Sequence, residues 1–315
     1  MPDTVIFESQ TATGPLPTVT IHHPAIKTYH KAPYPSISPT LPSLSQSGRT
    51  VLIAGGSTGI GFAIARAFVQ ANASRVILLG RRKNIVEASA AQLASETPAG
   101  TKTTVTGVAV DMLDTEGTKR VWSEFKAQGI HVDVLVLNAA TTGEFGPILQ
   151  AGLEKTWRAF EMNVKVLLDW TEGFWRQGGE GKKYLVNVST SAITNWETDA
   201  PVIPAYGLTK NAGTLLLQQI AKDTDVNDMQ VVSYYPGGVL TELGLNNGVK
   251  EEMYDWDQVE LPGQFAVWAA TDEAQFAHGR FLATHWDIDE LKGEEFQKEI
   301  AETNNFLKIG VVGVH

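Results

Sequence analysis

A tyrosine and a lysine one helical turn apart are the two side chains whose types and spacing most clearly suggest chemistry. Tyr206 and Lys210 lie in the stretch PAYGLTKNAG, and i, i+4 spacing places both on one face of a helix. A free tyrosine titrates near ~10. A cation about 5 Å away, at an effective dielectric of about 20, is worth roughly 3 kcal/mol, or about two pKa units. The phenol could then serve as an acid/base near neutral pH, although a solvated surface pair has the same spacing.

A glycine-rich turn upstream makes the catalytic interpretation of this pair stronger. In RTVLIAGGSTGIGFAIARAFVQ, the apolar run 51–54 is followed by Gly55, Gly59 and Gly61 and then by apolar residues at helical spacing. Strand, glycine turn and helix in succession are the context of a dinucleotide site, although the spacing is GxxxGxG. The three glycines would allow a tight turn, close approach of a pyrophosphate and helix–strand packing, with the helix N-terminus facing the anion. The other expected cofactor contacts in the turn are Ser57, Thr58 and Ile60.

Six motifs in one order resemble those of the short-chain dehydrogenase/reductase family, over roughly residues 48 to 286. They read AGGSTGIG, LNAA, FEMNVKV, YLVNVSTSA, the YxxxK pair and YYPGGVLTEL. Ala54 stands where the family usually has threonine. The end of this region, GRFLATHWDIDEL, departs from the common family ending and is similar to fungal members.

The end of the second expected strand favours NADP(H) over NAD(H). An acidic residue there would bond the adenosine ribose and repel a 2′-phosphate, but RVILLGRR carries Gly80, Arg81 and Arg82 instead. A guanidinium can bind a phosphate through two hydrogen bonds and stack on adenine. We therefore expect Arg81 to be the main phosphate contact, assisted by Ser57 or Arg82. Both arginines could instead be solvated at the start of a helix.

The resemblance implies further cofactor contacts at the ends of the other strands. Asp111 and Met112 match the positions that frame the adenine ring, although Asp111 could instead cap the next helix. Asn138 and Ala139 would line the adenosine ribose. The segment after the sixth strand would approach the nicotinamide carboxamide, through Pro236, Gly237, Val239 and Thr241.

The resemblance also implies the catalytic roles. Tyr206 would move the proton during hydride transfer, and Lys210 would bond the nicotinamide ribose and lower the pKa of the tyrosine. Asn163 would hold a water that links Lys210 to solvent, a role compatible with satisfying backbone groups at a helix kink.

The hydroxyl that polarises the substrate carbonyl is ambiguous. The family has a serine three residues after the strand asparagine, and that position from Asn187 is Thr190. A threonine can donate the same hydrogen bond, but its methyl group narrows the pocket. We favour Thr190, with Ser191 a close second if the loop is shifted by one residue. Both could also be ordinary strand-end residues.

From Thr50 onward the pattern predicts an α/β fold, a Rossmann-type doubly wound parallel sheet of about seven strands with helices on both faces. Residues 48–315 would form this single NADP-binding catalytic domain. Residues 1–47, rich in proline, serine and threonine, would form an extended arm that wraps the domain or a partner subunit. The expected strands are 51–54, 75–79, 103–110, 132–137, 184–189, 230–235 and 280–284. The expected helices are 59–71, 83–95, 115–128, 150–177, 205–223 and 262–270.

Composition excludes several classes of function. A net charge of −10 argues against nucleic-acid binding. No apolar run reaches about 18 residues and no secretory signal begins the chain, so we expect a cytoplasmic protein without a membrane partner. The chain has no cysteine, which excludes disulfides and thiolate ligands. We expect no metal site, because the arm histidines lack acidic company.

The expected substrate is a largely hydrophobic or cyclic ketone, or the corresponding secondary alcohol. It would lie among the 191–204 loop, the segment after Gly143 and residues 242–260, whose apolar members are Phe145, Ile193, Trp196, Leu243, Leu245, Met253, Tyr254 and Trp256.

The leading interpretation is an NADP-dependent ketoreductase of fungal secondary metabolism. The alternatives are a non-redox step on the same fold, such as cyclisation, isomerisation or dehydration, and a non-catalytic nucleotide sensor or scaffold. Family resemblance and apolar residues on more than one helix face predict a homodimer or homotetramer.

Overall fold

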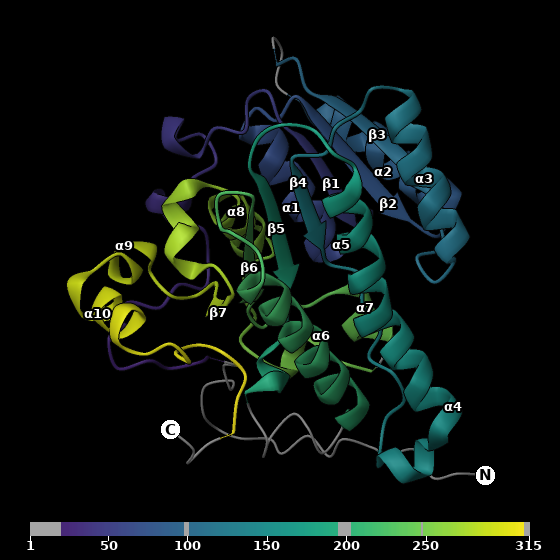
Figure 1. The fold of residues 1–315 in the computed structure, drawn as a ribbon. Coiled ribbons are helices and arrows are strands. Elements are labelled where there is room, and N and C mark those ends of the chain that lie inside the picture. The colour runs from purple at the N-terminus through teal and green to yellow at the C-terminus, as the bar shows by residue number, and fades with distance from the viewer. Residues whose placement is uncertain (1–19, 98–100, 195–202, 247, 312–315) are drawn as a thin grey trace.

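The computed structural model describes residues 20–97, 101–194, 203–246 and 248–311. Its centre is one seven-stranded sheet in the order β3-β2-β1-β4-β5-β6-β7, and every paired strand is parallel to its neighbours. This confirms the predicted doubly wound fold (Figure 1). The strands are β1 Thr50–Ala54, β2 Arg75–Gly80, β3 Thr104–Ala109, β4 Val134–Leu137, β5 Lys183–Val188, β6 Met229–Tyr235 and β7 Arg280–Ala283.

Helices cover both faces of the sheet because successive strand residues point to opposite sides. The main helices are α1 Gly59–Gln70, α2 Lys83–Glu96, α3 Thr115–Ala127, α4 Ile148–Phe160, α5 Val166–Arg176, α6 Pro204–Lys222 and α8 Glu260–Ala269. Val51 and Ile53 of β1 pack into one apolar cluster with α1 and α8. Leu52 and Ala54 pack into a second cluster with α3, α5 and α6.

The single helix predicted over 150–177 is wrong in detail. The structure divides it into α4 and α5, joined by a π-helical turn at Glu161–Lys165. Gly152 is also non-helical, with φ of +80°. Short helices that the sequence pattern did not predict are α7 Glu242–Asn246, α9 Ile288–Leu291 and α10 Glu294–Glu302.

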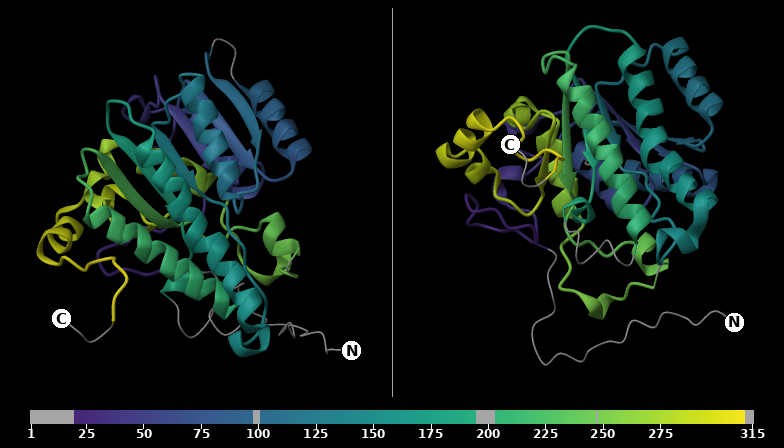
Figure 2. Two further views of the ribbon diagram at one scale, coloured as in Figure 1. Left: turned by 45° about the vertical axis from the view of Figure 1, so that its right-hand side comes forward. Right: turned by 60° about the horizontal axis from the view of Figure 1, so that its bottom comes forward.

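The described part of the arm, residues 20–47, packs on the same chain. Its apolar anchors lie in or against the first cluster, together with Trp286 and Phe296. The Tyr34 hydroxyl donates to the Trp286 carbonyl at 3.0 Å, and Tyr29 forms an isolated antiparallel bridge with Trp286. Figure 2 shows the arm, in purple, beside the yellow C-terminal elements. The anchors are Ile26, Tyr29, Tyr34, Ile37, Leu41 and Leu44.

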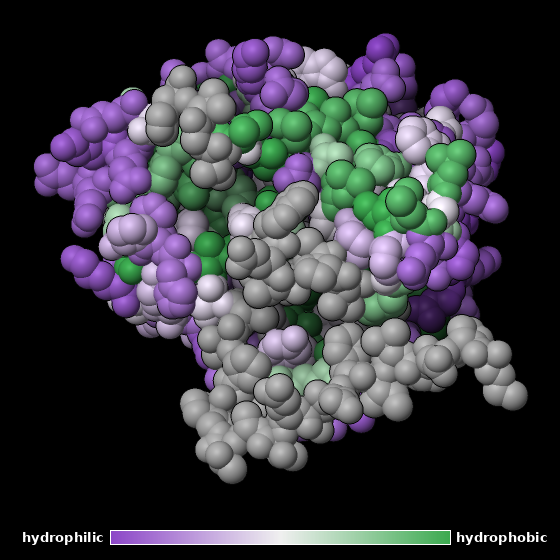
Figure 3. Space-filling model, turned by 90° about the horizontal axis from the view of Figure 1, so that it is seen from below, coloured by the Kyte–Doolittle hydropathy of each residue, from purple (hydrophilic) through white to green (hydrophobic). Residues whose placement is uncertain are grey.

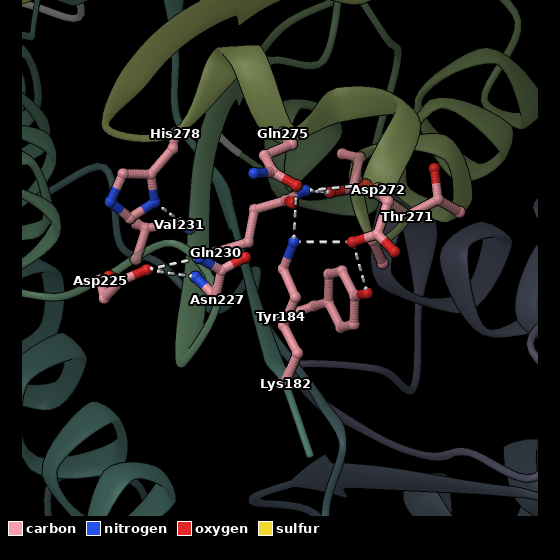
Figure 4. A network of polar contacts seen from close by, with 12 residues as sticks. Lys182, Tyr184, Asp225, Asn227, Gln230, Val231, Thr271, Asp272, Gln275 and His278 are labelled. Carbon is pink, nitrogen blue, oxygen red and sulfur yellow. Dashed lines mark hydrogen bonds and ion pairs between the residues drawn. The ribbon is translucent and has the colours of Figure 1, made fainter.

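A polar network ties β5 to the segment before β7 at the amino ends of the strands (Figure 4). The Lys182 ammonium lies 2.6 Å from the Asp272 carboxylate, and the Tyr184 hydroxyl donates to the same oxygen at 3.0 Å. These contacts hold the pKa of Asp272 below its usual value. Ligand sites in doubly wound sheets lie at the carboxyl ends of the strands, so this network is structural.

Candidate functional site

A cleft of about 810 Å³ lies at the carboxyl ends of the central strands. It opens beside β1 and β4, where the strand order reverses, which is the usual place for a dinucleotide in this fold. Of the residues predicted for the site, three do not line the cleft: Gly61, Asn163 and Ser191. Those that do are Gly55, Ser57, Thr58, Gly59, Ile60, Arg81, Arg82, Asp111, Met112, Asn138, Ala139, Thr190, Tyr206, Lys210, Pro236, Gly237, Val239 and Thr241.

The glycine turn between β1 and α1 has the close approaches that its sequence predicts. Gly55 has φ of +72°, and a Cβ there would lie 3.0 Å from the Cα of Ala139. A Cβ on Gly61 would lie only 2.0 Å from the Gly55 carbonyl oxygen, so Gly61 lets the helix pack against the turn. The side-chain amide nitrogen of Asn138 donates to that same carbonyl at 2.9 Å. This cradle of backbone fits a pyrophosphate at the start of α1.

The carboxyl end of β2 presents two arginines to the cleft. Both Arg81 and Arg82 are exposed, and the Arg82 guanidinium lies 3.9 Å from the Glu242 carboxylate of α7. Gly80 is the last residue of β2 and directly precedes the two arginines. A Cβ on Gly80 would lie 3.2 Å from the Ser57 hydroxyl oxygen. Ser57 therefore lies next to the place where an acidic residue would stand in an NAD-type site.

The suggestion that Asp111 caps the next helix is wrong. The N-cap of α3 is Asp114, and the carbonyl of Asp111 accepts a hydrogen bond from the Asp114 amide at 2.9 Å. The Asp111 side chain accepts from the Leu113 amide at 3.0 Å. Its position in the cleft remains consistent with an adenine contact.

Tyr206 and Lys210 line the cleft from the first turns of α6, which begins at Pro204. Proline suits the first turn because its missing N–H would be unpaired there. Lys210 is buried, with 3% of its surface exposed, and its ammonium donates to the Val188 carbonyl at 2.6 Å. Burial lowers the pKa of Lys210 to about 8. Lys210 is therefore mostly protonated at pH 7, and its ammonium carries three N–H donors, one of which bonds the Val188 carbonyl.

Asn163 lies in the π-helical turn, buried behind the cleft. Its amide nitrogen donates to the Thr141 carbonyl at 2.8 Å and to the Thr209 hydroxyl at 2.9 Å. Its side-chain oxygen accepts from the Thr141 amide at 2.9 Å. The Asn163 side chain thus joins the loop after β4 to the kink and to α6, and it satisfies backbone groups as predicted. Its role toward a water stays a prediction.

The three hydroxyls after β5 have different surroundings. The Ser189 hydroxyl lies 2.7 Å from that of Thr214, so these two groups share a hydrogen bond. The Thr190 oxygen accepts from the Ala192 amide at 3.2 Å, which leaves its O–H to donate elsewhere. Thr190 lines the cleft, whereas Ser191 is buried outside it. This geometry favours Thr190 as the donor.

The side of the cleft next to α4 is more polar than the sequence suggested. Of the apolar residues predicted there and described by the structure, Leu243 alone lines the cleft; Ile193 packs against the core, and Trp196 lies outside the described residues. The cleft instead includes Lys155 and Arg158 of α4. Lys155 lies 3.1 Å from the Glu144 carboxylate. Figure 3 views the molecule from this side, where green hydrophobic residues lie beside purple hydrophilic ones.

Sequence reasoning missed several groups around the site. The Val188 carbonyl that binds Lys210 is a backbone atom, and its position at the end of an apolar strand was the one signal that the sequence offered. Lys155 and Arg158 lie three residues apart on a helix that was predicted, so their shared face could have been noticed. Glu242 and Asn246 line the cleft from α7, a helix too short for a periodicity signal.

Within residues 20–97, 101–194, 203–246 and 248–311, no group of three histidine, aspartate or glutamate side chains is placed to hold a metal ion. In the same part of the chain, no helix combines the length and apolar character needed to span a bilayer.

Comparison with known proteins places this geometry in a family. The short chain dehydrogenase/reductase nsrO of Aspergillus novofumigatus is 31% identical to this protein, and the alignment covers 91% of this chain and 96% of nsrO. AacuD, of the same type, from Aspergillus aculeatus is 29% identical over 91% and 96%.

Solved structures share the fold. The RhlG/NADP active-site complex of Pseudomonas aeruginosa superposes with a TM-score of 0.68 at 20% identity, covering 77% of this chain and 97% of that one. L-sorbose reductase from Gluconobacter frateurii, complexed with NADPH and L-sorbose, superposes with a TM-score of 0.65 at 23% identity, covering 76% of this chain and 96% of that one.

The family model described as short chain dehydrogenase matches residues 49–252. The chain therefore belongs to the short chain dehydrogenase family of oxidoreductases.

Proposed function

We propose that the protein is an NADP(H)-dependent oxidoreductase that transfers a hydride between the nicotinamide and a ketone or secondary alcohol. One observation carries this proposal: Tyr206, Lys210 and Thr190 line the same cleft as the glycine turn at the start of α1. A side-chain acid/base, a buried cation and a hydroxyl donor thus lie in one cleft with a pyrophosphate cradle. A nucleotide sensor would need only the cradle.

Each of these side chains has a role in the proposed reduction. The cofactor, when bound, supplies the hydride. Thr190 donates its O–H to the substrate oxygen and stabilises the negative charge that develops there. Tyr206 delivers the proton to the same oxygen. The Lys210 ammonium stabilises the phenolate that remains, because a nearby cation favours the anionic form.

We propose a hydrophobic ketone of a fungal biosynthetic pathway as the substrate, reduced by a cytoplasmic enzyme. The support is the family relatives from Aspergillus species and the apolar Leu243 and Met162 in the cleft, whereas Lys155 and Arg158 on its α4 side would face a polar part of such a substrate. The test is NADPH oxidation with a panel of ketones, beside NADPH binding measured by calorimetry. Turnover of a ketone is expected. Tight binding with no turnover of any carbonyl compound would favour the non-redox or the sensing alternative.

Replacing Arg81 by alanine should weaken NADPH binding by about tenfold to a hundredfold, because a hydrogen bond between charged groups contributes roughly 1.5–3 kcal/mol. NADH lacks the 2′-phosphate, so its affinity should change little. Calorimetric titration of both cofactors measures the two effects. Lys83→Ala is the matched control, since Lys83 is a neighbouring exposed cation outside the cleft. Equal affinity of the wild type for NADH and NADPH would contradict the assignment of cofactor.

We propose a homodimer or homotetramer that assembles through α4, α5 and α6. Leu153 and Trp157 lie four residues apart on α4 after the break at Gly152, so they share one face, and they are 83% and 59% exposed. Leu149, before that break, is 96% exposed. Exposed apolar residues of this size favour a protein partner. Light scattering at micromolar concentration should give at least twice the mass of the chain. Trp157→Glu should shift that mass toward the monomer, and a monomeric wild type would contradict the proposal.

A further inference from the structure

The turn after β6 is held from outside the cleft by one carboxylate. Pro236, Gly237 and Val239 of this turn line the cleft, and Gly237 has φ of +90°. Asp257 accepts a hydrogen bond from the Gly238 amide at 2.7 Å and donates its own amide to the Gly238 carbonyl at 2.7 Å. Both backbone groups of Gly238 are therefore paired with one residue.

The contact between Asp257 and the turn leaves no room for a side chain. A Cβ on Gly237 would lie 2.4 Å from the Asp257 carboxylate oxygen. The positive φ of Gly237 is readily adopted only by glycine. The glycine thus serves two purposes, since it permits the turn and admits the carboxylate that fixes it.

The arm in turn holds the segment that carries Asp257. The Gln258 amide donates to the Lys31 carbonyl at 2.8 Å. The Lys31 ammonium lies 2.5 Å from the Asp255 carboxylate and also donates to the Asp255 carbonyl. Lys31 adjoins His30, whose ring nitrogen lies 2.7 Å from the Asp287 carboxylate. A continuous set of contacts therefore runs from the arm, through residues 255–258, to the turn in the cleft.

We propose that Asp257 is a positioning residue for the cofactor, and that it sets the Gly237–Gly238 turn against the bound nicotinamide nucleotide with the arm as its support. This inference rests on the proposed function, because it assumes that the cleft holds the dinucleotide. Asp257 does not line the cleft. It acts through the backbone of the turn.

The charge of Asp257 gives the proposal a signature in pH. Burial raises the pKa of Asp257 to about 6, against the lowering effect of the Gly238 amide and Lys31 and with a small further rise from Asp255. An acid whose pKa is higher in the folded than in the unfolded protein lowers stability as pH rises from about 4 to 6. The ionised carboxylate therefore reduces stability at pH 8, while it accepts a charged hydrogen bond from Gly238.

Three variants of the full-length protein test this inference by NADPH calorimetry at pH 8 and pH 5.5. Asp257→Ala removes the acceptor and should raise the Kd for NADPH about tenfold at pH 8, since one hydrogen bond to a charged group is lost. Asp257→Asn keeps a neutral acceptor of the same shape, so at pH 8 its Kd should lie between those of the wild type and Asp257→Ala. From pH 8 to pH 5.5 the wild type should lose more affinity than Asp257→Asn, because protonation of Asp257 weakens its bond to Gly238. The 2′-phosphate of NADPH titrates near ~6 and should affect both proteins alike. Glu252→Gln is the control, an exposed acidic residue of the same segment.

Thermal unfolding supplies a second readout. The Tm of Asp257→Asn should exceed that of the wild type by a few degrees at pH 8, and by less at pH 5.5, because the amide has no charge to bury. NADPH affinity of Asp257→Ala within twofold of the wild type at pH 8 would overturn the inference. So would an unchanged pH dependence in Asp257→Asn. Failure of the wild type to bind NADPH would instead refute the proposed function, so the two failures are distinguishable.

Discussion

Tyr206→Phe should lower turnover by about 10²–10⁴-fold, the usual contribution of a positioned acid/base, while NADPH affinity stays near that of the wild type. The phenylalanine keeps the ring and its packing and removes only the oxygen that carries the proton. Lys210 would remain in place, because its ammonium donates to the Val188 carbonyl. Substrate-saturated NADPH oxidation and calorimetric titration measure the two quantities.

Tyr29→Phe is a control for the Tyr206 variant, since Tyr29 lies in the arm and its hydroxyl bonds only neighbouring backbone groups. That variant should turn over as the wild type does. A rate for Tyr206→Phe within tenfold of the wild type would exclude the general-acid role. The non-redox alternative would then be favoured, because the cofactor cradle would remain without its proton donor.

The cost of burying Lys210 supports a chemical role for it. A fall in lysine pKa from 10.5 to about 8 means that the folded protein binds this proton less tightly than the unfolded chain. Stability from this group is complete only above the unfolded value near 10.5 and is lost as pH falls toward 8. At neutral pH the buried ammonium therefore destabilises the fold. An apolar residue would avoid that cost, so the lysine is better explained by the anion it can stabilise in the cleft.

Local patterns were sufficient to predict the fold and to identify the glycine turn and the YxxxK pair that line the cleft. Strands buried on both faces read as continuous apolar runs, which is why β1 and β4 to β6 were recognised. The glycine turn and the YxxxK pair each depend on short-range spacing, and the structure brings both into one cleft. Alternating strands and helices predict a parallel sheet, whose strands all end at one edge, so these residues meet at the carboxyl ends of the strands.

Features that depend on distant contacts could not be predicted in the same way. The break between α4 and α5 is stabilised by Asn163, whose partners Thr141 and Thr209 come from two other segments. The two short helices near the C-terminus pack beside the arm, and their apolar faces are too short to show a period. Asp287 accepts from the amides of Asp289 and Glu290 at the start of α9, and this capping pattern was the one local signal available.

The substrate side was the least predictable because it depends on tertiary placement. An apolar side chain such as Ile193 has the same sequence signature whether it lines a cleft or fills the core, and here it packs on the core. Arg158 and Lys155 reach the cleft because α4 runs past the end of the sheet. Periodicity predicted the helix and not which of its faces meets the ligand.

Thr190→Val should lower turnover by about 10²–10³-fold, the usual effect of removing one preorganised donor to a developing oxyanion. Valine keeps the branched shape of threonine and removes the O–H. It also removes the oxygen that accepts from the Ala192 amide at 3.2 Å, so some loss of stability should accompany the change. Thermal unfolding measured beside turnover separates the two effects.

Thr190→Ser and Ser191→Ala complete the test of the donor. Serine at position 190 restores the hydroxyl without the methyl group, so turnover should recover to within a few fold of the wild type. Ser191→Ala should have little effect on turnover, because Ser191 lies outside the cleft. A larger loss from Ser191→Ala than from Thr190→Val would show that the loop after β5 shifts by one residue when substrate binds. If neither variant changed turnover by more than a few fold, the carbonyl would have to be polarised by backbone N–H groups instead.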